Sequence, residues 1–142
     1  GHSVVNPNGP QCFCGKKGCV STFISGSGLE EMIYENLKIK VSAEKFLSQL
    51  IYSSKEEAIL NKFYEYYGLS LANIINTIDP DVIILGGGLS NHQPLYTKGL
   101  KMVYKNIFCD EPNTPILKNA LGDSAGVIGA AIIGKIKAGK NG

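Results

Sequence analysis

One imidazole and three thiols near the start of the chain could together bind a metal ion. They follow the spacing H-x9-C-x-C-x4-C and are His2, Cys12, Cys14 and Cys19. Imidazole and thiolate are ligands that Zn²⁺ accepts, and four of them complete a tetrahedral structural site. The glycines next to the cysteines let the backbone turn sharply enough for the thiols to face one ion. This segment therefore predicts a zinc site that holds a loop in shape.

Three alternatives to a four-ligand zinc site stay open. The cysteines could form disulfides, which need an oxidising compartment of which the sequence shows no sign. Cys12 and Cys14 could be loop thiols that bind nothing. His2 could be the remnant of an expression tag, which would leave a site of three cysteines. The spacing differs from that of zinc fingers and zinc knuckles, so nucleic acid is not a predicted partner.

The composition is that of a folded chain without a preference for nucleic acid or lipid. The chain has 142 residues, of which 44% are hydrophobic and 18% charged, enough for one core of ordinary domain size. All 14 cationic side chains are lysines, and with 12 carboxylates the net charge is only +2, too little for a nucleic-acid clamp. No apolar run approaches the roughly 20 residues of a membrane span, and the first residues do not form a signal peptide. We predict a cytoplasmic protein without a membrane partner.

The pattern of apolar residues divides the chain into two regions. Residues 1–28 hold three of the four cysteines and are predicted to be a zinc-binding loop with a short strand at 4–5. Residues 29–138 are predicted to be an α/β domain. Helices are expected over residues 29–37, 43–52, 55–77, 94–108 and from about 123 onwards, and strands over 82–85 and 114–117. Two strands joined through a helix predict a parallel, right-handed crossover.

The longest predicted helix has clear start and stop signals. Ser54 and Glu57 have the spacing of a capping box, and Asp79 precedes a proline, which disfavours helical geometry in the residue before it. Gly68 interrupts the helix at a cost of about 1 kcal/mol relative to alanine, which predicts close packing there. Apolar residues recur on one face every three or four positions. They are Leu60, Phe63, Tyr64, Tyr67, Leu71, Ile74, Ile75 and Ile78.

A glycine run after the first strand is a candidate ligand-binding turn. The strand over 82–85 is continuously apolar, as is typical of a strand buried on both faces, and Gly86, Gly87 and Gly88 follow it. Open α/β sheets bind ligands at the carboxyl ends of their strands, and bare backbone lets a nucleotide lie against N–H groups. The alternative is a tight strand-to-helix turn. Of the remaining reactive residues, His92 is predicted to lie on the surface and Cys109 to be buried.

Taken together, these motifs resemble the ROK family (repressor, open reading frame, kinase). The resemblance extends nearly from one end of the chain to the other. It is carried by residues 1–2, 6–10, 12–19 and 22–28 around the cysteines, by residues 78–88 around the glycine run, and by residues 122–131. Within the family, residues 22–28 and the region of Asn91 are most similar to bacterial fructokinases and mannokinases.

This resemblance implies a fold and a function. ROK sugar kinases have a two-domain actin-like ATPase fold, related to ribonuclease H, and the chain resembles their C-terminal domain. Their N-terminal domain carries the general base for the sugar hydroxyl and is absent from this chain, so we expect a fragment that is inactive alone. The implied function is ATP-dependent phosphorylation of a hexose, as in a fructokinase. The alternative is a sugar-sensing ROK repressor whose DNA-binding part lies outside the chain.

The resemblance also assigns roles to single residues, none of them catalytic. His2 matches the ROK histidine that binds zinc with one ring nitrogen and offers the other to a sugar hydroxyl. Ser21 stands where the family usually has a sugar-binding glutamate, and a hydroxyl cannot make the charge-assisted hydrogen bonds of a carboxylate. Gly86, Gly87 and Gly88 match the nucleotide side of the cleft. The implied ligands are structural zinc, a hexose and MgATP, and the implied partners are the N-terminal half and a second copy in a homodimer.

Overall fold

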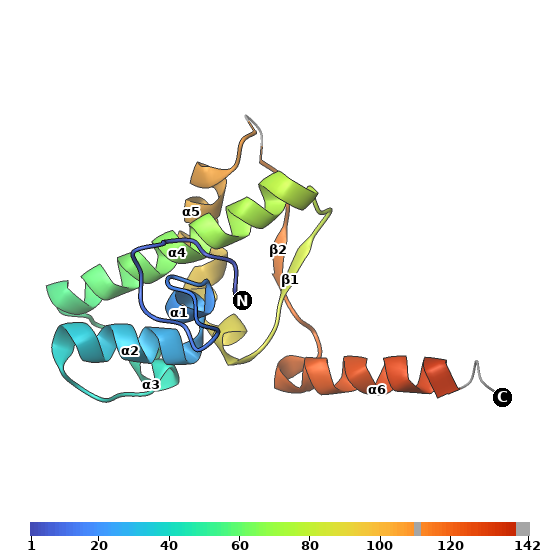
Figure 1. Ribbon diagram of the computed structural model, residues 1–142, viewed down its shortest axis with the longest axis horizontal. Helices are drawn as coiled ribbons and strands as arrows, with labels where there is room; N and C mark the ends of the chain where they lie inside the picture. Colours follow the sequence, from blue (N-terminus) through green and yellow to red (C-terminus); the bar gives the residue numbers. More distant parts are fainter. Residues whose placement is uncertain (110–111, 139–142) are drawn as a thin grey trace.

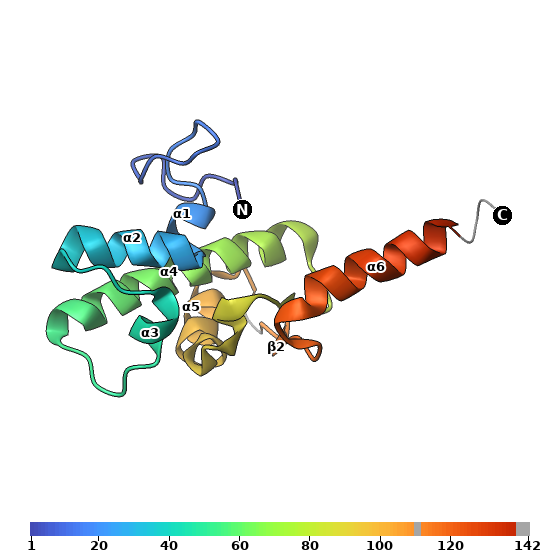
Figure 2. The ribbon, with the colours of Figure 1, turned by 90° about the horizontal axis from the view of Figure 1, so that it is seen from below.

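The computed structural model describes residues 1–109 and 112–138, which form a helical body, a two-stranded sheet and a last helix that extends away from both (Figure 1). The elements in chain order are α1 (Ser21–Ile24), α2 (Gly26–Leu37), α3 (Ala43–Leu47), α4 (Ser54–Ile78), β1 (Ile83–Leu85), η1 (Gly88–Asn91), η2 (Gln93–Tyr96), α5 (Lys98–Asn106), β2 (Ile116–Lys118), η3 (Gly122–Ser124) and α6 (Ala125–Ala138). The loop before α1 projects from one side of the helical body (Figure 2).

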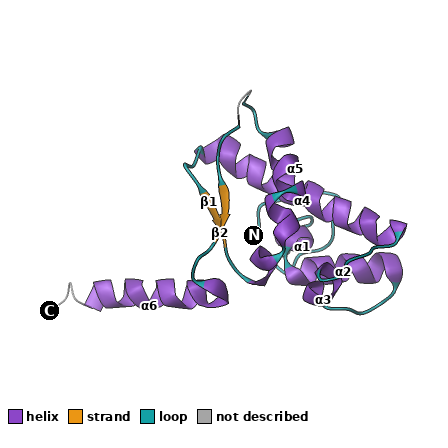
Figure 3. Ribbon diagram, turned by 180° about the vertical axis from the view of Figure 1, so that it is seen from behind, coloured by secondary structure: helices purple, strands orange, loops and turns teal. Residues whose placement is uncertain are grey.

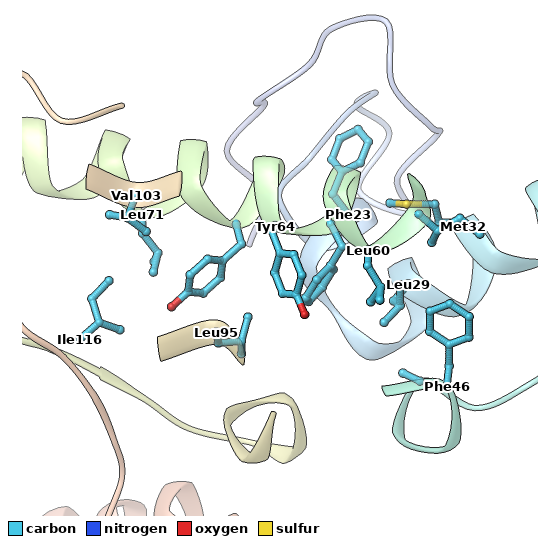
Figure 4. Close-up of a cluster of buried hydrophobic side chains, with 14 of the residues drawn as sticks. Phe23, Leu29, Met32, Phe46, Leu60, Tyr64, Leu71, Leu95, Val103 and Ile116 are labelled. Carbon is cyan, nitrogen blue, oxygen red and sulfur yellow. The ribbon is translucent and has the colours of Figure 1, made fainter. Parts of the chain in front are cut away.

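The hydrophobic core gathers around the long helix α4. Its apolar face packs against α1 and α2 and, further along, against α5. Figure 4 shows the buried side chains as a row along α4, from Phe46, Leu29 and Leu60 at one end to Leu71, Val103 and Ile116 at the other. The core therefore ties the N-terminal loop, through α1, to the segment that leads into the sheet.

Helix α4 confirms the predicted helix, but its capping box lies one residue earlier than predicted. Ser53 and Glu56 form the box in place of Ser54 and Glu57. The Ser53 hydroxyl accepts the backbone N–H of Glu56, and the Glu56 carboxylate accepts the backbone N–H of Ser53 at 2.7 Å. Hydrogen bonds from the hydroxyl and the N–H of Ser53 lower the pKa of Glu56. The helix ends where predicted, at Asp79, which has a left-handed conformation with φ of 50°.

The Ser53→Ala variant is expected to lose about 1 kcal/mol of unfolding free energy, because the first turn of α4 loses a hydrogen-bond acceptor for its free N–H groups. Urea denaturation measures the difference. The matched control is Ser54→Ala, which we expect to change stability by no more than about 0.5 kcal/mol. A larger loss for Ser54→Ala than for Ser53→Ala would place the cap at the position that the sequence pattern favours.

The apolar stripe of α4 is buried over most of its length and narrows at the end. Leu71 and Ile75 are buried there, whereas Ile74 and Ile78 are exposed, so the predicted apolar face is mostly but not wholly part of the core. Ile74 and Ile78 lie beside the part of α4 that packs against α5. The predicted close packing at Gly68 is confirmed, since a Cβ there would lie 2.5 Å from the backbone of α5.

Strands β1 and β2 pair in parallel, as predicted (Figure 3). The register aligns Ile83 with Ile116 and Leu85 with Lys118. Ile83 and Leu85 pack against the core, whereas Ile84 between them is 62% exposed. The prediction of a strand buried on both faces is therefore wrong among the described residues. The helical body covers one face of the sheet, and alternate side chains of a strand point to opposite faces.

Two elements near the N-terminus are shorter than predicted. The strand expected at residues 4–5 is an isolated antiparallel bridge between Val4 and Cys19. Helix α3 ends at residue 47 instead of 52. The chain turns back after α3, and the hydroxyl of Tyr52 donates to the carbonyl of Phe46 at 3.0 Å. Of the apolar residues after the helix, only Tyr52 packs against the core, whereas Leu50 and Ile51 are exposed, so the apolar spacing over 48–52 does not indicate a buried helix face.

The second half of the chain also departs from the predicted boundaries. The helix expected over 94–108 begins at residue 98, because residues 93–96 form a 3-10 turn that contains Pro94. Strand β2 covers 116–118 in place of 114–117, and α6 begins at residue 125, after the short turn η3. Cys109 is exposed and not buried as predicted, because it follows the end of α5 where the chain leaves the body.

Helix α6 presents apolar side chains to solvent among the described residues. Val127 is 75% exposed, and Ile128, Ile132 and Ile133 are exposed as well. Figure 1 shows the helix extending from the sheet and away from the helical body. Within the described part of the chain, no helix combines the length and the hydropathy that crossing a membrane requires.

Candidate metal and nucleotide sites

The four predicted zinc ligands converge in the N-terminal loop. Their ligand atoms lie within 4.8 Å of one another, and we call His2, Cys12, Cys14 and Cys19 the zinc-ligand cluster. The Sγ of Cys12 lies 3.5 Å from Nδ1 of His2, and the Sγ atoms of Cys14 and Cys19 are 3.5 Å apart. Cys12 and Cys19 are buried, and no disulfide joins these thiols.

The distances within the cluster fit a tetrahedral zinc ion. Zn–S bonds of about 2.3 Å and Zn–N bonds of about 2.0–2.1 Å place two sulfurs about 3.8 Å apart, and a sulfur and a nitrogen about 3.6 Å apart. The two shortest separations, both 3.5 Å, are slightly shorter than these values, and the cluster as a whole, with ligand atoms within 4.8 Å, is slightly wider than a zinc tetrahedron. One imidazole and three thiols are also a donor set that structural zinc sites use. The residues therefore fit zinc, held through Nδ1 of His2 and three Sγ atoms.

Tight backbone turns bring these ligands together. Gly15 and Gly18 have left-handed conformations, with φ of 87° and 66°. A Cβ at Gly18 would overlap the carbonyl oxygen of Asn6, so glycine alone fits there. The N–H of Gly18 donates to the carbonyl of Pro10 at 2.8 Å, and the N–H of Val5 donates to the carbonyl of Gly18 at 2.9 Å. These bonds fold the loop back on itself and place Cys19 beside the segment that carries His2.

The two buried thiols of the cluster have opposite pKa shifts. Hydrogen bonding from the backbone of Cys14 lowers the pKa of Cys12 to about 6, against the opposing effect of burial. Burial raises the pKa of Cys19 to about 11, because an apolar environment disfavours the thiolate. Without a metal, Cys12 therefore favours the thiolate more strongly than Cys19 does. Metal binding must release the Cys19 proton, since the thiolate is the ligand.

The two residues predicted to bind a sugar lie beside the cluster. The hydroxyl of Ser21 is 3.8 Å from Sγ of Cys12, which in turn contacts His2. The N–H of Ser21 donates to the carbonyl of Gly1 at 2.9 Å, so the start of α1 is tied to the segment of His2. The ring of Phe13 meets the His2 ring edge to face, with centroids 4.9 Å apart. The structure thus brings His2 and Ser21 together on one side of the loop.

The glycine run follows β1 and leaves its backbone open. A Cβ at Gly86, Gly87 or Gly88 would meet no other residue within 4 Å, and Gly87 has φ of 78°. The next turn is held by the buried Ser90, whose hydroxyl donates to the carbonyl of Gly87 at 2.7 Å. The Asn119 side chain, which follows β2, donates to the last carbonyl of β1 at 3.1 Å. The turn is therefore rigidly attached to the sheet while its glycines stay accessible.

A cavity of about 850 Å³ lies at the end of the glycine run, and Gly88 lines it. Its walls come from α3 and the segment after it up to Tyr52, from the first half of α4, from residues 88–98 and from Gly26 at the start of α2. The polar and charged side chains of these walls include Glu44, Glu57, Asn61, Tyr64, His92 and Lys98. No residue of the zinc-ligand cluster lines the cavity, so the metal ligands and the glycine run belong to separate sites.

Sequence reasoning missed this cavity and misplaced one of its residues. His92 is half-buried and not on the surface, because its Nε2 lies 2.6 Å from the hydroxyl of Tyr64. Tyr64 was expected only in the core. The sequence offers one indication that His92 belongs to this site, which is that it closely follows the glycine run. Nothing in the sequence connects it with Tyr64, which lies 28 residues away.

An N-acetyl-D-glucosamine kinase of Haemophilus influenzae (strain 86-028NP) is 39% identical over 125 residues, which are 87% of this chain and 41% of that kinase. The chain therefore spans about two fifths of the length of this curated relative.

Solved structures of sugar kinases also match this chain over about half of their own length. A ROK hexokinase from Thermus thermophilus has a TM-score of 0.84 at 29% identity, over 100% of this chain and 48% of that one. A ROK family glucokinase from Streptomyces griseus, solved with glucose and AMPPNP, has a TM-score of 0.75 at 23% identity, over 94% and 49%. The fold is thus the predicted α/β fold of an actin-like ATPase half. A model described as the ROK family matches residues 1–137, and this chain therefore belongs to the ROK family.

Proposed function

We propose that this chain is the C-terminal part of an ATP-dependent sugar kinase and supplies its sugar-binding loop and part of its nucleotide site. The observation that carries the proposal is the convergence of His2 and Ser21 on the zinc-ligand cluster in a chain of the ROK family. The relatives compared above are named as sugar kinases. The general base is still expected outside this chain. The repressor alternative also stays a prediction, and its DNA-binding part would likewise lie elsewhere.

A zinc ion held by the cluster would stabilise the loop and take no part in the transfer of the phosphoryl group. With Nδ1 of His2 as the metal ligand, the ring proton is on Nε2. His2 is exposed, so this N–H is available to a sugar hydroxyl. Ser21 offers a neutral hydroxyl as the second contact. Because it lacks the charge of a carboxylate, we expect it to bind a sugar hydroxyl more weakly than a glutamate would.

The identity of the sugar is the finer part of the proposal. The sequence motifs favour a fructokinase-like or mannokinase-like substrate. The names of the curated relatives favour N-acetyl-D-glucosamine instead. The relatives match over 87% of the chain, whereas the fructokinase likeness rests on residues 22–28 and the region of Asn91. We therefore propose N-acetyl-D-glucosamine as the first substrate to test and fructose as the second.

MgATP is the proposed phosphoryl donor, with its nucleoside end in the 850 Å³ cavity beside Gly88. This position is at the carboxyl end of a parallel strand, where open α/β sheets bind ligands. Phosphoryl transfer depends mainly on positioning and on neutralising charge. The role of this chain is accordingly to seat the nucleotide against the glycine run, while the phosphates hold Mg²⁺.

The partners proposed for this chain are an N-terminal half and a second copy in a homodimer. Exposed apolar residues on α6 and on the open face of the sheet, such as Val127 and Ile84, support a further protein layer on that side. The long helix α4 offers a surface for dimer contacts away from its core face. A cytoplasmic location is proposed with this function.

A coupled assay of ADP release on the full-length gene product tests the proposal. The sugars are N-acetyl-D-glucosamine, fructose, mannose and glucose, each supplied with MgATP. Turnover of the first with little turnover of fructose would support the substrate proposed here, and the reverse result would support the fructokinase prediction. No turnover with any of the four sugars would contradict a kinase and favour the repressor.

A further inference from the structure

Tyr64 and His92 form a hydrogen-bonded pair in the wall of the cavity. The hydroxyl of Tyr64 lies 2.6 Å from Nε2 of His92, and the two ring planes are within 8° of parallel with centroids 6.0 Å apart. Tyr64 belongs to α4, and His92 follows η1, the turn that begins at Gly88. Both side chains line the cavity. The pair therefore joins the α4 wall of the cavity to the segment that continues the glycine run.

The surroundings determine which partner donates. Burial raises the pKa of Tyr64 to about 12, so its hydroxyl keeps the proton. Burial and, to a smaller extent, the charge of Lys98 lower the pKa of His92, so the imidazole is neutral near pH 7. Tyr64 then donates to Nε2, and the single ring proton of His92 is on Nδ1. This is one defined hydrogen bond between two uncharged groups.

Other bonds attach the same segment to the sheet side of the cavity. The hydroxyl of Tyr96 in η2 donates to the carbonyl of Ser90 at 2.8 Å. The hydroxyl of Ser90 donates to Gly87, and the Asn119 side chain lies 3.4 Å from that hydroxyl. These contacts come from η2 and from the residue after β2. The Tyr64–His92 hydrogen bond attaches the segment to α4 as well, which the contacts from η2 and Asn119 do not do.

We propose that the Tyr64–His92 hydrogen bond sets the position of Gly88 relative to α4 and thereby the affinity of this chain for a nucleotide. The inference rests on the proposed nucleotide site and goes beyond it, because it names two positioning residues outside the glycine run. Neither residue is assigned contact with the reacting phosphates. Their expected effect is on binding: without the bond, the segment after Gly88 keeps its apolar contacts with the core through Leu89 and Leu95 but loses its polar attachment to α4, so Gly88 is held less precisely.

A double-mutant cycle with ADP as the probe tests this inference. Binding is measured by calorimetry on the full-length gene product, for the wild type, Tyr64→Phe, His92→Ala and the double variant. Each single variant is expected to bind ADP about tenfold more weakly, as the loss of one hydrogen bond allows. The double variant is expected to be no weaker than the singles, because both remove the same bond. The conservative His92→Gln variant keeps an acceptor for Tyr64 and should recover affinity to within about threefold of wild type.

Tyr66→Phe is the matched control. It removes a hydroxyl from the same helix, one that accepts a hydrogen bond from Asn6 at 2.8 Å and does not line this cavity, so ADP affinity should not change. Nitrogen NMR of the imidazoles, of which the chain has two, should show Nε2 of His92 unprotonated in the wild type and altered in Tyr64→Phe, whatever the effect on stability.

The outcomes separate this inference from the function on which it rests. A wild-type chain that binds ADP, with additive losses or with unchanged affinity in the variants, would overturn the positioning role and leave the nucleotide site standing. A full-length wild-type protein that does not bind ADP would overturn the nucleotide site and the inference together. Equal losses in Tyr64→Phe and Tyr66→Phe would likewise contradict a specific role for the pair.

Discussion

The Cys19→Ser variant is expected to lose its zinc and with it the folded N-terminal loop. Cys19 has 0% exposure, and its Sγ is 3.5 Å from that of Cys14. A serine hydroxyl is a poor ligand in a sulfur-rich zinc site, so affinity should fall by more than the roughly 10–100-fold that changes around the ligands cause. Elemental analysis of protein purified without chelator should give about one zinc per wild-type chain and a small fraction of that for the variant.

Loss of zinc should also lower the melting temperature, because a structural zinc site contributes directly to the free energy of folding. Cys109→Ser is the matched control, since Cys109 is exposed and lies outside the cluster. It should keep about one zinc per chain and the wild-type melting temperature. Equal zinc content in the two variants would show that Cys19 is not a ligand, and a wild-type protein without metal would remove the basis for the sugar-binding loop.

The metal ligands could be predicted from the sequence because their chemistry is local. His2 and the three cysteines lie within 19 residues, and thiols with imidazole at short spacing have few roles in a glycine-rich loop. The structure brings their ligand atoms within 4.8 Å. Zinc binding itself stays a prediction. The sugar-binding role of Ser21 rests on the resemblance to ROK proteins and also stays a prediction, whereas its position beside Cys12 comes from the structure.

Burial on one face of an element was harder to predict than the element itself. Apolar period identified α2 to α6 and the two strands, but α1 and the start of α2 lie within residues 1–28, which the sequence predicts to be a loop. The crossover rule correctly made the strands parallel. The same pattern wrongly predicted Ile84 to be buried and did not reveal the exposed face of α6. An apolar run reports that a side chain favours burial, not which part of the molecule buries it. Among the described residues, the helical body covers one face of the sheet, and the face that carries Ile84 is exposed.

The cavity could not be predicted because its walls are brought together only by the packing of α4. Tyr64 matched the apolar stripe of a helix, and its ring does belong to the core. Its hydroxyl, however, reaches His92, which is 28 residues away in sequence. Periodicity places a residue on a face but does not identify the polar group that a tyrosine at the edge of that face will find. Long-range polar pairs of this kind require coordinates.

The Gly68→Ala variant is expected to destabilise the protein by about 1–3 kcal/mol, as overpacking of a tight contact does. Alanine favours a helix over glycine by about 1 kcal/mol, so the helix alone predicts the opposite sign. A Cβ at Gly68 would lie 2.5 Å from the carbonyl carbon of Met102, a backbone atom that no change of rotamer can move away. On α5, Gly99 likewise packs closely against the ring of Tyr67 on α4. Because the two helices are in close contact at both positions, a local shift at Gly68 cannot relieve the clash.

Urea denaturation of the Gly68→Ala and Gly126→Ala variants separates the effect of overpacking from that of helix propensity. Gly126 lies in α6, where a Cβ would meet no other residue within 4 Å, so this control should gain up to about 1 kcal/mol from helix propensity alone. The same chemical change should therefore have opposite signs at the two sites. If Gly68→Ala stabilised the protein as Gly126→Ala does, the crossing of α4 and α5 would be looser than the structure shows. The cavity wall that α4 and the segment after Gly88 form would then lack its rigid support.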